Sequence, residues 1–399
     1  MLLISVCAGR WQLNGIKCAI DAGFDVLALD ANPDAAGFDF ATKSIVVDVT
    51  DTNAVLDVLR KSNIRPDGAV SFVAEVGMPA VAAIRDQYNL PGIDTKITKR
   101  LTNKVIQREY WQKKGLPNPE WIHCCNFDDV EKAKSQIVYP VIVKPSDSAG
   151  SRGVNFINSE DSLITAAKNA FSYSRNNTIL IESVLQGSEY TVETFSCNNK
   201  THVLAVTVKR KMIGTNNTVA DQLMTPQIEE SLEKKIRLLA CEALDTLGVN
   251  EGPGHVEIMS TDNGKMGLIE AAARGGGFMV FDYLVPLFSG YDLVSATAMQ
   301  AVGIDPPPFS LKKESKNVVL LRFIPSKMGI VKSIDGFEDA NRIEGVKAES
   351  FVSIGEEVQS ASTDGDRLAY IVTNAKNHKT AIELADKAED LIEIDVSLD

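Results

Sequence analysis

The first ninety residues show apolar runs of strand length, separated by segments whose apolar positions repeat at helical spacing. The predicted strands are Leu2–Ala8, Val26–Leu29, Ile45–Val47 and Gly68–Val73. Between them, Ile16, Ala19 and Ile20 fall on one helical face, and Met78–Tyr88 has the length and spacing of another helix. Strands that alternate with helices predict a parallel, doubly wound α/β sheet.

The rest of the chain changes its pattern twice, which predicts two further domains. Residues 95–115 form a basic helical segment, and residues 120–305 hold a denser series of strands. The run Pro306–Pro308 interrupts this pattern, and the tail returns to strands followed by a helix at Thr380–Ile392. The expected domains are an α/β domain at 1–94, a strand-rich α+β domain at 95–305 and a small α+β domain at 306–399.

The composition is that of a globular chain and disfavours nucleic acid and membranes as partners. The 399 residues leave room for two to three domains, and 44% hydrophobic with 24% charged residues is an ordinary soluble balance. The 41 basic and 53 acidic side chains give a net charge of −12, which disfavours a surface that coats nucleic acid. No apolar run reaches the ~18 residues of a membrane-spanning helix, so we expect no membrane partner.

The six cysteines and four histidines lack the spacings of a disulfide framework or a zinc site. No two cysteines are spaced C-x-x-C, and no histidines are spaced H-x-x-H. The first apolar run is too short for the core of a signal peptide. We therefore expect free thiols and a cytoplasmic location.

Lys144 stands at the end of an apolar strand and is followed by a loop of small residues. The loop includes Ser148, Gly150, Ser151 and Gly153. Small residues let backbone N–H groups approach an anion closely, and the lysine adds a fixed positive charge. This arrangement suits a phosphate group, although it lacks the G-x-x-x-x-G-K-[ST] spacing of a Walker loop. The alternative is a flexible hairpin with a solvated lysine.

A short linker joins two strands a little further on and has acids at both ends. Glu182 closes the first strand, Val184 lies in the linker, and Glu189 opens the second strand. Such a linker offers backbone groups to an adenine edge, and Glu189 offers a carboxylate to ribose hydroxyls. The alternative is a plain crossover between strands whose acids face solvent.

Two glutamates that lie on neighbouring predicted strands form the most specific pattern. A hairpin over residues 255–270 would place Glu257 and Glu270 side by side, followed by Arg274 and three glycines. Two carboxylates in one cleft repel each other unless a cation lies between them. Magnesium prefers oxygen ligands and couples carboxylates to substrate phosphates. The alternative, a surface hairpin with solvated acids, does not account for the Arg-Gly-Gly-Gly run.

The first predicted strand does not lead into a dinucleotide fingerprint. Gly9 is followed by Arg-Trp-Gln-Leu-Asn-Gly, which departs from G-x-G-x-x-G. Asp30 lies where an acid that binds ribose would lie, but many second strands end in Asp for reasons of turn geometry. We interpret residues 1–94 as a Rossmann-like domain without a bound dinucleotide, which disfavours a dinucleotide oxidoreductase.

The ATP-grasp superfamily is resembled over essentially the whole chain by an ordered set of residues: Lys104, Lys144 with its small-residue loop, Glu182 to Glu189, and Glu257 and Glu270 followed by Arg274. The N-terminal sheet is similar to a pre-ATP-grasp domain. The tail, with Leu321–Pro325, Gly329–Val331 and Asp366–Tyr370, resembles the C-terminal domain of the L-amino-acid ligase and biotin-carboxylase-like branches, and the amino-acid ligase branch is the nearest match. The resemblance implies a two-lobed ATP-grasp domain, with a glycine-rich lid lobe at about 120–185 and a metal-binding lobe at about 186–305.

The resemblance also implies a role for each matching residue. Lys104 and Lys144 would contact ATP phosphates, with the loop Ser148–Gly153 closing over them, while Glu182, Val184 and Glu189 would hold adenine and ribose. Glu257 and Glu270 would bind Mg²⁺, for which Mn²⁺ can substitute, and Arg274 would stabilise the phosphorylated carboxylate. The implied partners are a small carboxylate and a small amine, and relatives are often homodimers.

Two departures from the family pattern concern the metal and the substrate. Many members have Asn two residues after the second glutamate, where this chain has Ala272, so the number of metal ions is in question. Relatives often place Glu and His in the loop before Pro226, where this chain has Asp221 and Gln222. The candidate substrate-binding residues are Arg10, Glu75, Asp221, His255, Gly276 and Arg322.

Three of these candidates have a structural alternative. Glu75 would also suit the N-terminus of a helix. Arg322 would also suit an interdomain salt bridge, and His255 would also suit a satisfied structural position.

The family implies that a carboxylate oxygen attacks the γ-phosphate to give an acyl phosphate and ADP, after which an amine displaces phosphate. Lysines and magnesium would neutralise charge on the transferring phosphoryl group. The alternatives are a carboxylase that activates bicarbonate, a purine-pathway ligase of the same superfamily, and a regulatory ATP-binding protein without catalysis.

Overall fold

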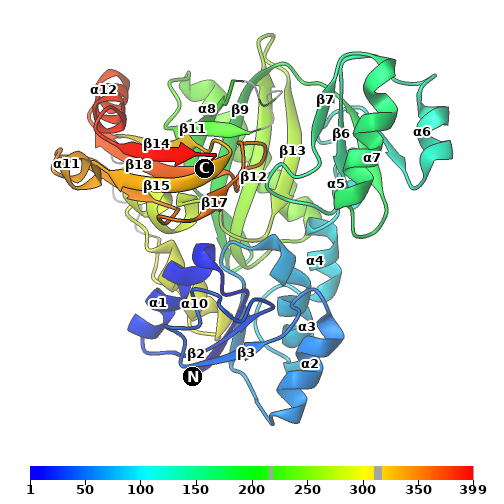
Figure 1. The fold of residues 1–399 in the computed structure, drawn as a ribbon. Helices are drawn as coiled ribbons and strands as arrows, with labels where there is room; N and C mark the ends of the chain where they lie inside the picture. The colour runs from blue at the N-terminus through cyan, green and yellow to red at the C-terminus, as the bar shows by residue number, and fades with distance from the viewer. Residues whose placement is uncertain (214, 216–218, 310–316, 399) are drawn as a thin grey trace.

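The structure is a computed structural model that describes residues 1–213, 215, 219–309 and 317–398 (Figure 1). Its N-terminal part is a four-stranded sheet of order β3-β2-β1-β4 in which all neighbours are parallel. The strands are β1 (Leu2–Val6), β2 (Asp25–Asp30), β3 (Lys43–Val46) and β4 (Gly68–Val70). The main helices are α1 (Leu13–Asp21), α2 (Thr52–Lys61) and α3 (Met78–Tyr88). The predicted doubly wound sheet is confirmed.

The first strand is shorter than the apolar run because Cys7 turns the backbone into the left-handed region, with φ 72°. The carboxylate of Asp30 then fixes this turn. Its Oδ2 accepts a hydrogen bond from Ala8 N at 2.7 Å, and its Oδ1 accepts one from Asn32 N at 2.9 Å. Asp30 therefore serves the backbone at the ends of β1 and β2, as expected of a strand-ending Asp.

The second part is a small antiparallel sheet of order β5-β8-β6-β7 that two helices cover. Its strands are β5 (Trp121–Cys124), β6 (Val141–Pro145), β7 (Asn155–Ile157) and β8 (Ile179–Ser183), and its helices are α6 (Phe127–Ala133) and α7 (Leu163–Tyr173). Two helices, α4 (Thr95–Leu101) and α5 (Lys104–Lys114), lead from the N-terminal sheet to this lobe. Figure 1 shows the lobe standing apart at the upper right.

The largest element is an antiparallel sheet of order β13-β12-β9-β10-β11-β14-β18-β16. Its first five members are β9 (Gly187–Cys197), β10 (Lys200–Lys211), β11 (Ala220–Met224), β12 (Gly252–Thr261) and β13 (Met266–Ala272). The helix α8 (Glu230–Leu247) packs on β10 and β12 through its buried apolar face. The remaining three strands are β14 (Val318–Pro325), β16 (Val346–Ser350) and β18 (Arg367–Ala375).

This sheet continues across the predicted domain boundary at residue 306. Strand β14 pairs with β11, so that Gln222 lies opposite Arg322. A three-stranded sheet of β15 (Gly329–Asp335), β17 (Glu357–Val358) and β19 (Glu393–Ser397), with helices α11 (Phe337–Asn341) and α12 (His378–Glu389), completes the C-terminal region. The division of the chain into three domains stays a prediction.

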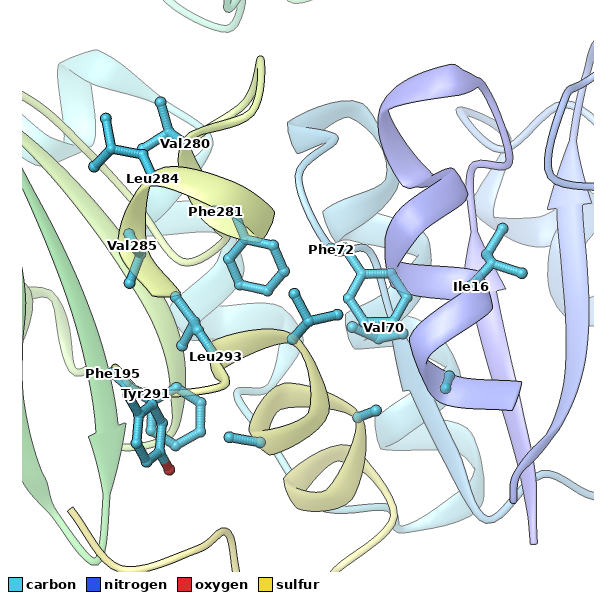
Figure 2. Close-up of a cluster of buried hydrophobic side chains, with 14 of the residues drawn as sticks. Ile16, Val70, Phe72, Phe195, Val280, Phe281, Leu284, Val285, Tyr291 and Leu293 are labelled. Carbon is cyan, nitrogen blue, oxygen red and sulfur yellow. The ribbon is translucent and has the colours of Figure 1, made fainter. Parts of the chain in front are cut away.

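A continuous apolar core joins the N-terminal sheet to the large sheet (Figure 2). Phe72 comes from the N-terminal part and faces Phe281 of the segment that follows β13, with ring centroids 6.3 Å apart. Helix α10 (Leu293–Ala301) packs against α1 and β4. Gly15 of α1 leaves room for Phe72, because a Cβ there would lie 2.3 Å from the ring. The core fixes the N-terminal sheet against the strands that carry the candidate site.

None of the helices in the described ranges has the length and apolar character needed to cross a bilayer.

Candidate active site

A cleft of about 900 Å³ lies where the small lobe, the large sheet, the N-terminal part and the C-terminal region meet. Its size is within the usual range for small-molecule sites. The predicted site residues that line it are Glu75, Lys104, Lys144, Ser148, Gly150, Ser151, Glu182, Val184, Glu189, His255, Glu257, Glu270, Arg274 and Gly276. The structure thus brings together, in one cleft, residues that are up to two hundred positions apart.

Glu182 lies at the centre of a buried charge cluster on the small sheet. Its register on β8 places it opposite Ile142 of β6. Its Oε1 accepts from Arg108 Nε at 2.8 Å, and its Oε2 lies 2.7 Å from Lys144 Nζ. Burial alone would raise the pKa of Glu182, but the two cations lower it to about 2. The pKa of Lys144 is lowered, because burial and the nearby Arg108 outweigh Glu182.

Lys104 is the first residue of α5, and the local sequence fixes it there. The side chain of Asn103 caps the helix by accepting from Val105 N and Ile106 N. Lys104 Nζ lies 3.0 Å from Glu270 Oε1 and donates to Ser148 O at 2.6 Å. Although burial opposes its charge, the carboxylates of Glu270 and Glu75 raise the pKa of Lys104. The lysine therefore links the small-residue loop to one of the two predicted metal ligands.

A second cluster of lysines and glutamates crosses three strands of the large sheet. Lys209 of β10 contacts both Glu189 Oε1 of β9, at 2.7 Å, and Glu257 Oε1 of β12. Lys211 Nζ lies 2.8 Å from Glu189 Oε2. Burial disfavours the charged carboxylate of Glu257, yet Lys209 and His255 hold the pKa of Glu257 well below its usual range. Each of the two glutamates is thus matched by a lysine.

The two predicted metal ligands face each other across a strand pair. Glu257 of β12 lies directly opposite Glu270 of β13 in the register, and the pairing slips after Glu257. The hairpin that the sequence predicts is confirmed. Across the described residues, no group of three or more His, Cys, Asp or Glu side chains is placed to hold a metal ion. Two carboxylates in a cleft that Lys104 and Lys144 also line nevertheless fit Mg²⁺, which commonly takes one or two protein carboxylates together with substrate phosphates.

Arg274 follows β13 and points its guanidinium toward the N-terminal part. Its Nη2 lies 3.3 Å from Glu75 Oε2, and its Nη1 donates to Gly275 O at 2.9 Å. Burial and the charge of Glu270 raise the pKa of Glu75, although Arg274 and Lys104 oppose this shift. The pair shows that a carboxylate fits beside Arg274 at this end of the cleft.

His255 is held by acids on two sides. Its Nδ1 contacts Glu193 Oε1, and its Nε2 lies 3.5 Å from Glu257 Oε1. Burial alone would lower the pKa of His255, but Glu193 raises it to about 9. Glu193 Oε2 also accepts from Gly276 N at 3.1 Å. Glu193 thus links His255 to the glycine run, and the protonated ring of His255 is a poor general base at neutral pH.

Four predicted site residues lie outside the lining of the cleft. Gly153 faces Tyr173, which a Cβ at Gly153 would meet at 2.9 Å. Arg10 is exposed and lies 3.7 Å from Glu356. Asp221 Oδ1 accepts from Arg210 Nε at 2.9 Å.

Arg322 faces α12 rather than the cleft. Its Nη1 lies 2.6 Å from Asp386 Oδ1 and 2.9 Å from Glu389 Oε2, and its Nε donates to Gln222 at 3.2 Å. Both ion pairs of Arg322 lie within the C-terminal region, and its contact across residue 306 is the hydrogen bond to Gln222 of β11, so the interdomain salt bridge considered from the sequence is not observed.

Sequence reasoning missed four residues that hold the site together: Arg108, Glu193, Lys209 and Lys211. Lys209 and Lys211 could have been predicted to lie on the same face of their strand, because residues two apart on a strand share a face. Arg108 lies in a helix among other basic residues, and nothing local separates it from its solvated neighbours. The aromatic residues Trp11, Phe278 and Phe323 also line the cleft.

Comparison with known proteins supplies a family for this arrangement. A model of the ATP-grasp domain matches residues 137–282, and a model of the L-amino acid ligase C-terminal domain 2 matches residues 322–397. The two matches together cover more than half of the chain.

Individual relatives are distant. An L-arginine-specific L-amino acid ligase of Bacillus subtilis is 21% identical over 83% of this chain and 81% of its own length. A D-alanine–D-alanine ligase of Pseudomonas entomophila (strain L48) is 26% identical over 51% of this chain and 60% of its own length.

The fold is shared at full length with a solved ligase. The crystal structure of L-amino acid ligase from Bacillus licheniformis superposes with a TM-score of 0.86 at 22% identity, over 99% of this chain and 98% of that chain. The chain therefore carries an ATP-grasp domain followed by an L-amino acid ligase C-terminal domain 2, and over almost its full length it resembles the L-amino acid ligase branch of the ATP-grasp superfamily.

Proposed function

We propose that this protein joins a carboxylate substrate, an amino acid, to an amine, with ATP as the energy source and ADP and phosphate as products. The ATP-grasp fold and the ligase relatives support the reaction class. The observation that carries the proposal is the position of Arg274, which follows the Glu257–Glu270 pair and already holds a carboxylate, that of Glu75.

The nucleotide end of the cleft supplies charge for the phosphates. Lys104 and Lys144 are buried lysines whose ammonium groups line the cleft beside the small-residue loop. Their charge opposes the negative charge of the triphosphate and of the phosphoryl group in transfer. Glu182 holds Lys144 in place. The carboxylate of Glu189, which Lys209 and Lys211 contact in the structure, would also accept hydrogen bonds from the ribose hydroxyls.

The residues that would hold Mg²⁺ are Glu257 and Glu270. When bound, the ion would neutralise phosphate charge and orient the γ-phosphoryl group for attack. Lys104 and Lys209 balance the two carboxylates in the structure, so they keep the pair close together.

Arg274 would orient the carboxylate substrate. Its planar guanidinium binds a carboxylate through two parallel hydrogen bonds, which fixes one oxygen toward the γ-phosphate. That oxygen attacks phosphorus, ADP leaves, and an acyl phosphate forms. The amine then attacks the acyl carbon, and the carbon–oxygen bond to phosphate breaks. The loop at 148–153 covers the phosphates and excludes water from this intermediate.

The test is ADP release by the purified protein with ATP and Mg²⁺. Three mixtures are compared: pooled amino acids without bicarbonate, bicarbonate without amino acids, and neither. We expect ADP and phosphate only in the first, with a new amide product by mass spectrometry. ADP release with bicarbonate alone would instead support the carboxylase alternative, and ADP release in no mixture would contradict the proposal.

A further inference from the structure

A turn of the C-terminal region reaches across the cleft to the phosphate loop of the small lobe. Thr363, Asp364, Gly365 and Arg367 all line the cleft. Asp364 Oδ2 accepts from Ser151 Oγ at 3.0 Å, and Asp364 N donates to Gly150 O at 3.4 Å. Two separate bonds therefore join this turn to the loop at 148–153, although more than two hundred residues lie between them.

The second oxygen of Asp364 is fixed from the opposite side. Arg367 Nη2 donates to Asp364 Oδ1 at 2.7 Å and to Ala220 O at 2.7 Å. The guanidinium of Arg367 is buried and lies over the rings of Phe278 and Phe323, with 4.6 Å and 3.7 Å to the ring centroids. Arg367 therefore anchors Asp364 to β11 of the large sheet and to the aromatic wall of the cleft.

The turn itself is preformed. The carboxylate of Asp366 accepts from the backbone N–H and the hydroxyl of both Ser362 and Thr363. These four bonds hold the turn without help from the loop. Asp364 is thus presented on a rigid support.

The backbone of the loop adopts a conformation that contacts from outside the loop can stabilise. Gly150 and Ser151 both have positive φ, of 68° and 61°. Positive φ is costly for a residue other than glycine, and such a conformation persists where the surroundings enforce it. The bonds of Asp364 to Ser151 Oγ and Gly150 O are among the contacts that stabilise this conformation.

We propose that Asp364 is a positioning residue that latches the phosphate loop closed over bound ATP, and that Arg367 sets its orientation. The inference rests on the proposed function for its catalytic meaning, because a closed loop keeps water from the acyl phosphate. The latch connects the loop to Phe278, so it joins the nucleotide end of the cleft to its substrate end. A C-terminal residue thereby controls the lid of another lobe.

Proteolysis at Arg152 tests the latch without any turnover. Arg152 is exposed in the middle of the loop, and trypsin cleavage after it gives fragments 1–152 and 153–399, which mass spectrometry identifies. With AMP-PNP and Mg²⁺ bound, we expect Asp364→Ala to be cleaved there about tenfold faster than the wild type. We expect Ser151→Ala to be cleaved about fivefold faster, the factor for one lost hydrogen bond.

The controls separate the latch from a general loosening of the fold. Ser135→Ala removes an exposed hydroxyl of the small lobe that donates to Lys132 O and takes no part in the latch, so its cleavage rate at Arg152 should match the wild type. Asp364→Asn keeps an oxygen for Ser151 and should lie between the wild type and Asp364→Ala. Equal cleavage of Asp364→Ala and the wild type, with nucleotide bound, would overturn the latch even if the ligase activity is present.

Coupling gives a second measurement in the active enzyme. In an open site, water attacks the acyl carbon, the carbon–oxygen bond to phosphate breaks, and the free carboxylate and phosphate result without an amide. Asp364→Ala should therefore release several ADP for each amide formed, whereas the wild type should release about one. An unchanged ratio of ADP to amide in Asp364→Ala, with a normal KM for ATP, would also overturn the latch. If nucleotide protects Arg152 from trypsin in the wild type but not in Asp364→Ala, the latch is supported even if no amino acid stimulates ADP release.

Discussion

The proposed nucleotide end and the proposed substrate end of the cleft differ in how their charges are balanced. At the nucleotide end, Glu182 and Glu189 each contact two cations inside buried clusters. At the substrate end, Arg274 and Glu75 form a single contact of 3.3 Å, beside aromatic walls that include Trp11. Under the proposed function, the first end is fixed in advance for the nucleotide, whereas at the second end a substrate carboxylate would replace Glu75 at Arg274.

The largest effect is expected where the two ends meet. Glu270→Gln keeps the shape of the side chain but removes the charge that Lys104 and the proposed Mg²⁺ share. We expect ADP release to fall on the order of 10³-fold, the size found when a group that stabilises the transition state is removed. Circular dichroism should show a retained fold, and Glu338→Gln, at an exposed position of α11, should have normal activity.

The stability of the nucleotide end depends on the charge of Glu182. Its folded pKa of about 2 lies below the ordinary value of 4.5, so its ionisation stabilises the fold above about pH 4.5. This contribution, about 3 kcal/mol, is lost as the pH falls from 4.5 toward 2. Glu182→Gln should therefore melt well below the wild type at pH 7, and the difference should shrink as the pH falls through this range. A difference that stays constant from pH 7 to pH 2.5 would contradict the assignment.

A matched pair of arginines separates function from structure. Arg274→Lys removes the planar fork, so we expect kcat/KM for the carboxylate substrate to fall about thirtyfold, the equivalent of about 2 kcal/mol for one charge-assisted hydrogen bond. The KM for ATP should not change. Arg322→Lys makes the same substitution at a buried arginine outside the cleft and should lower the melting temperature without changing either constant. Equal kinetic losses in both variants would show that Arg274 acts only through stability.

The smallest effect is expected at the aromatic wall. Trp11 packs edge-to-face on Phe278, with ring centroids 4.5 Å apart, and lines the cleft. Trp11→Ala should raise the KM for the amino acid about fivefold, the value of roughly 1 kcal/mol for one aromatic pair, and leave the KM for ATP as it is. A change in the KM for ATP alone would mean that Trp11 contacts the nucleotide, which would contradict its assignment to the substrate end of the cleft.

Local patterns in the sequence were enough to predict the N-terminal sheet and the hairpin of Glu257 and Glu270. Both depend on period and spacing within short segments. The pairing of β11 with β14 was not predictable in the same way, because it joins strands about a hundred residues apart. Arg322 was ambiguous for the same reason: its acids lie on α12, and only the assembled fold shows whether an arginine faces them or the cleft.

The residues of the candidate site likewise differ in whether a local pattern or only a tertiary contact reveals them. Lys144 and the paired glutamates were predicted from local patterns, and the family resemblance added Lys104. Lys209 and Glu193 enter the site through cross-strand neighbours, and Asp364 enters it from a turn of the C-terminal region. A side chain that acts through tertiary contacts leaves little trace in the local pattern.

The most direct test of the account follows one oxygen atom. An amino acid that stimulates ADP release is labelled with ¹⁸O in its carboxylate, and the released phosphate is analysed by mass spectrometry. Because the carboxylate oxygen attacks the γ-phosphate and stays on phosphorus when the amine attacks the acyl carbon, each phosphate should carry one ¹⁸O. Phosphate without label, formed together with the amide, would contradict an acyl phosphate and with it the proposed function.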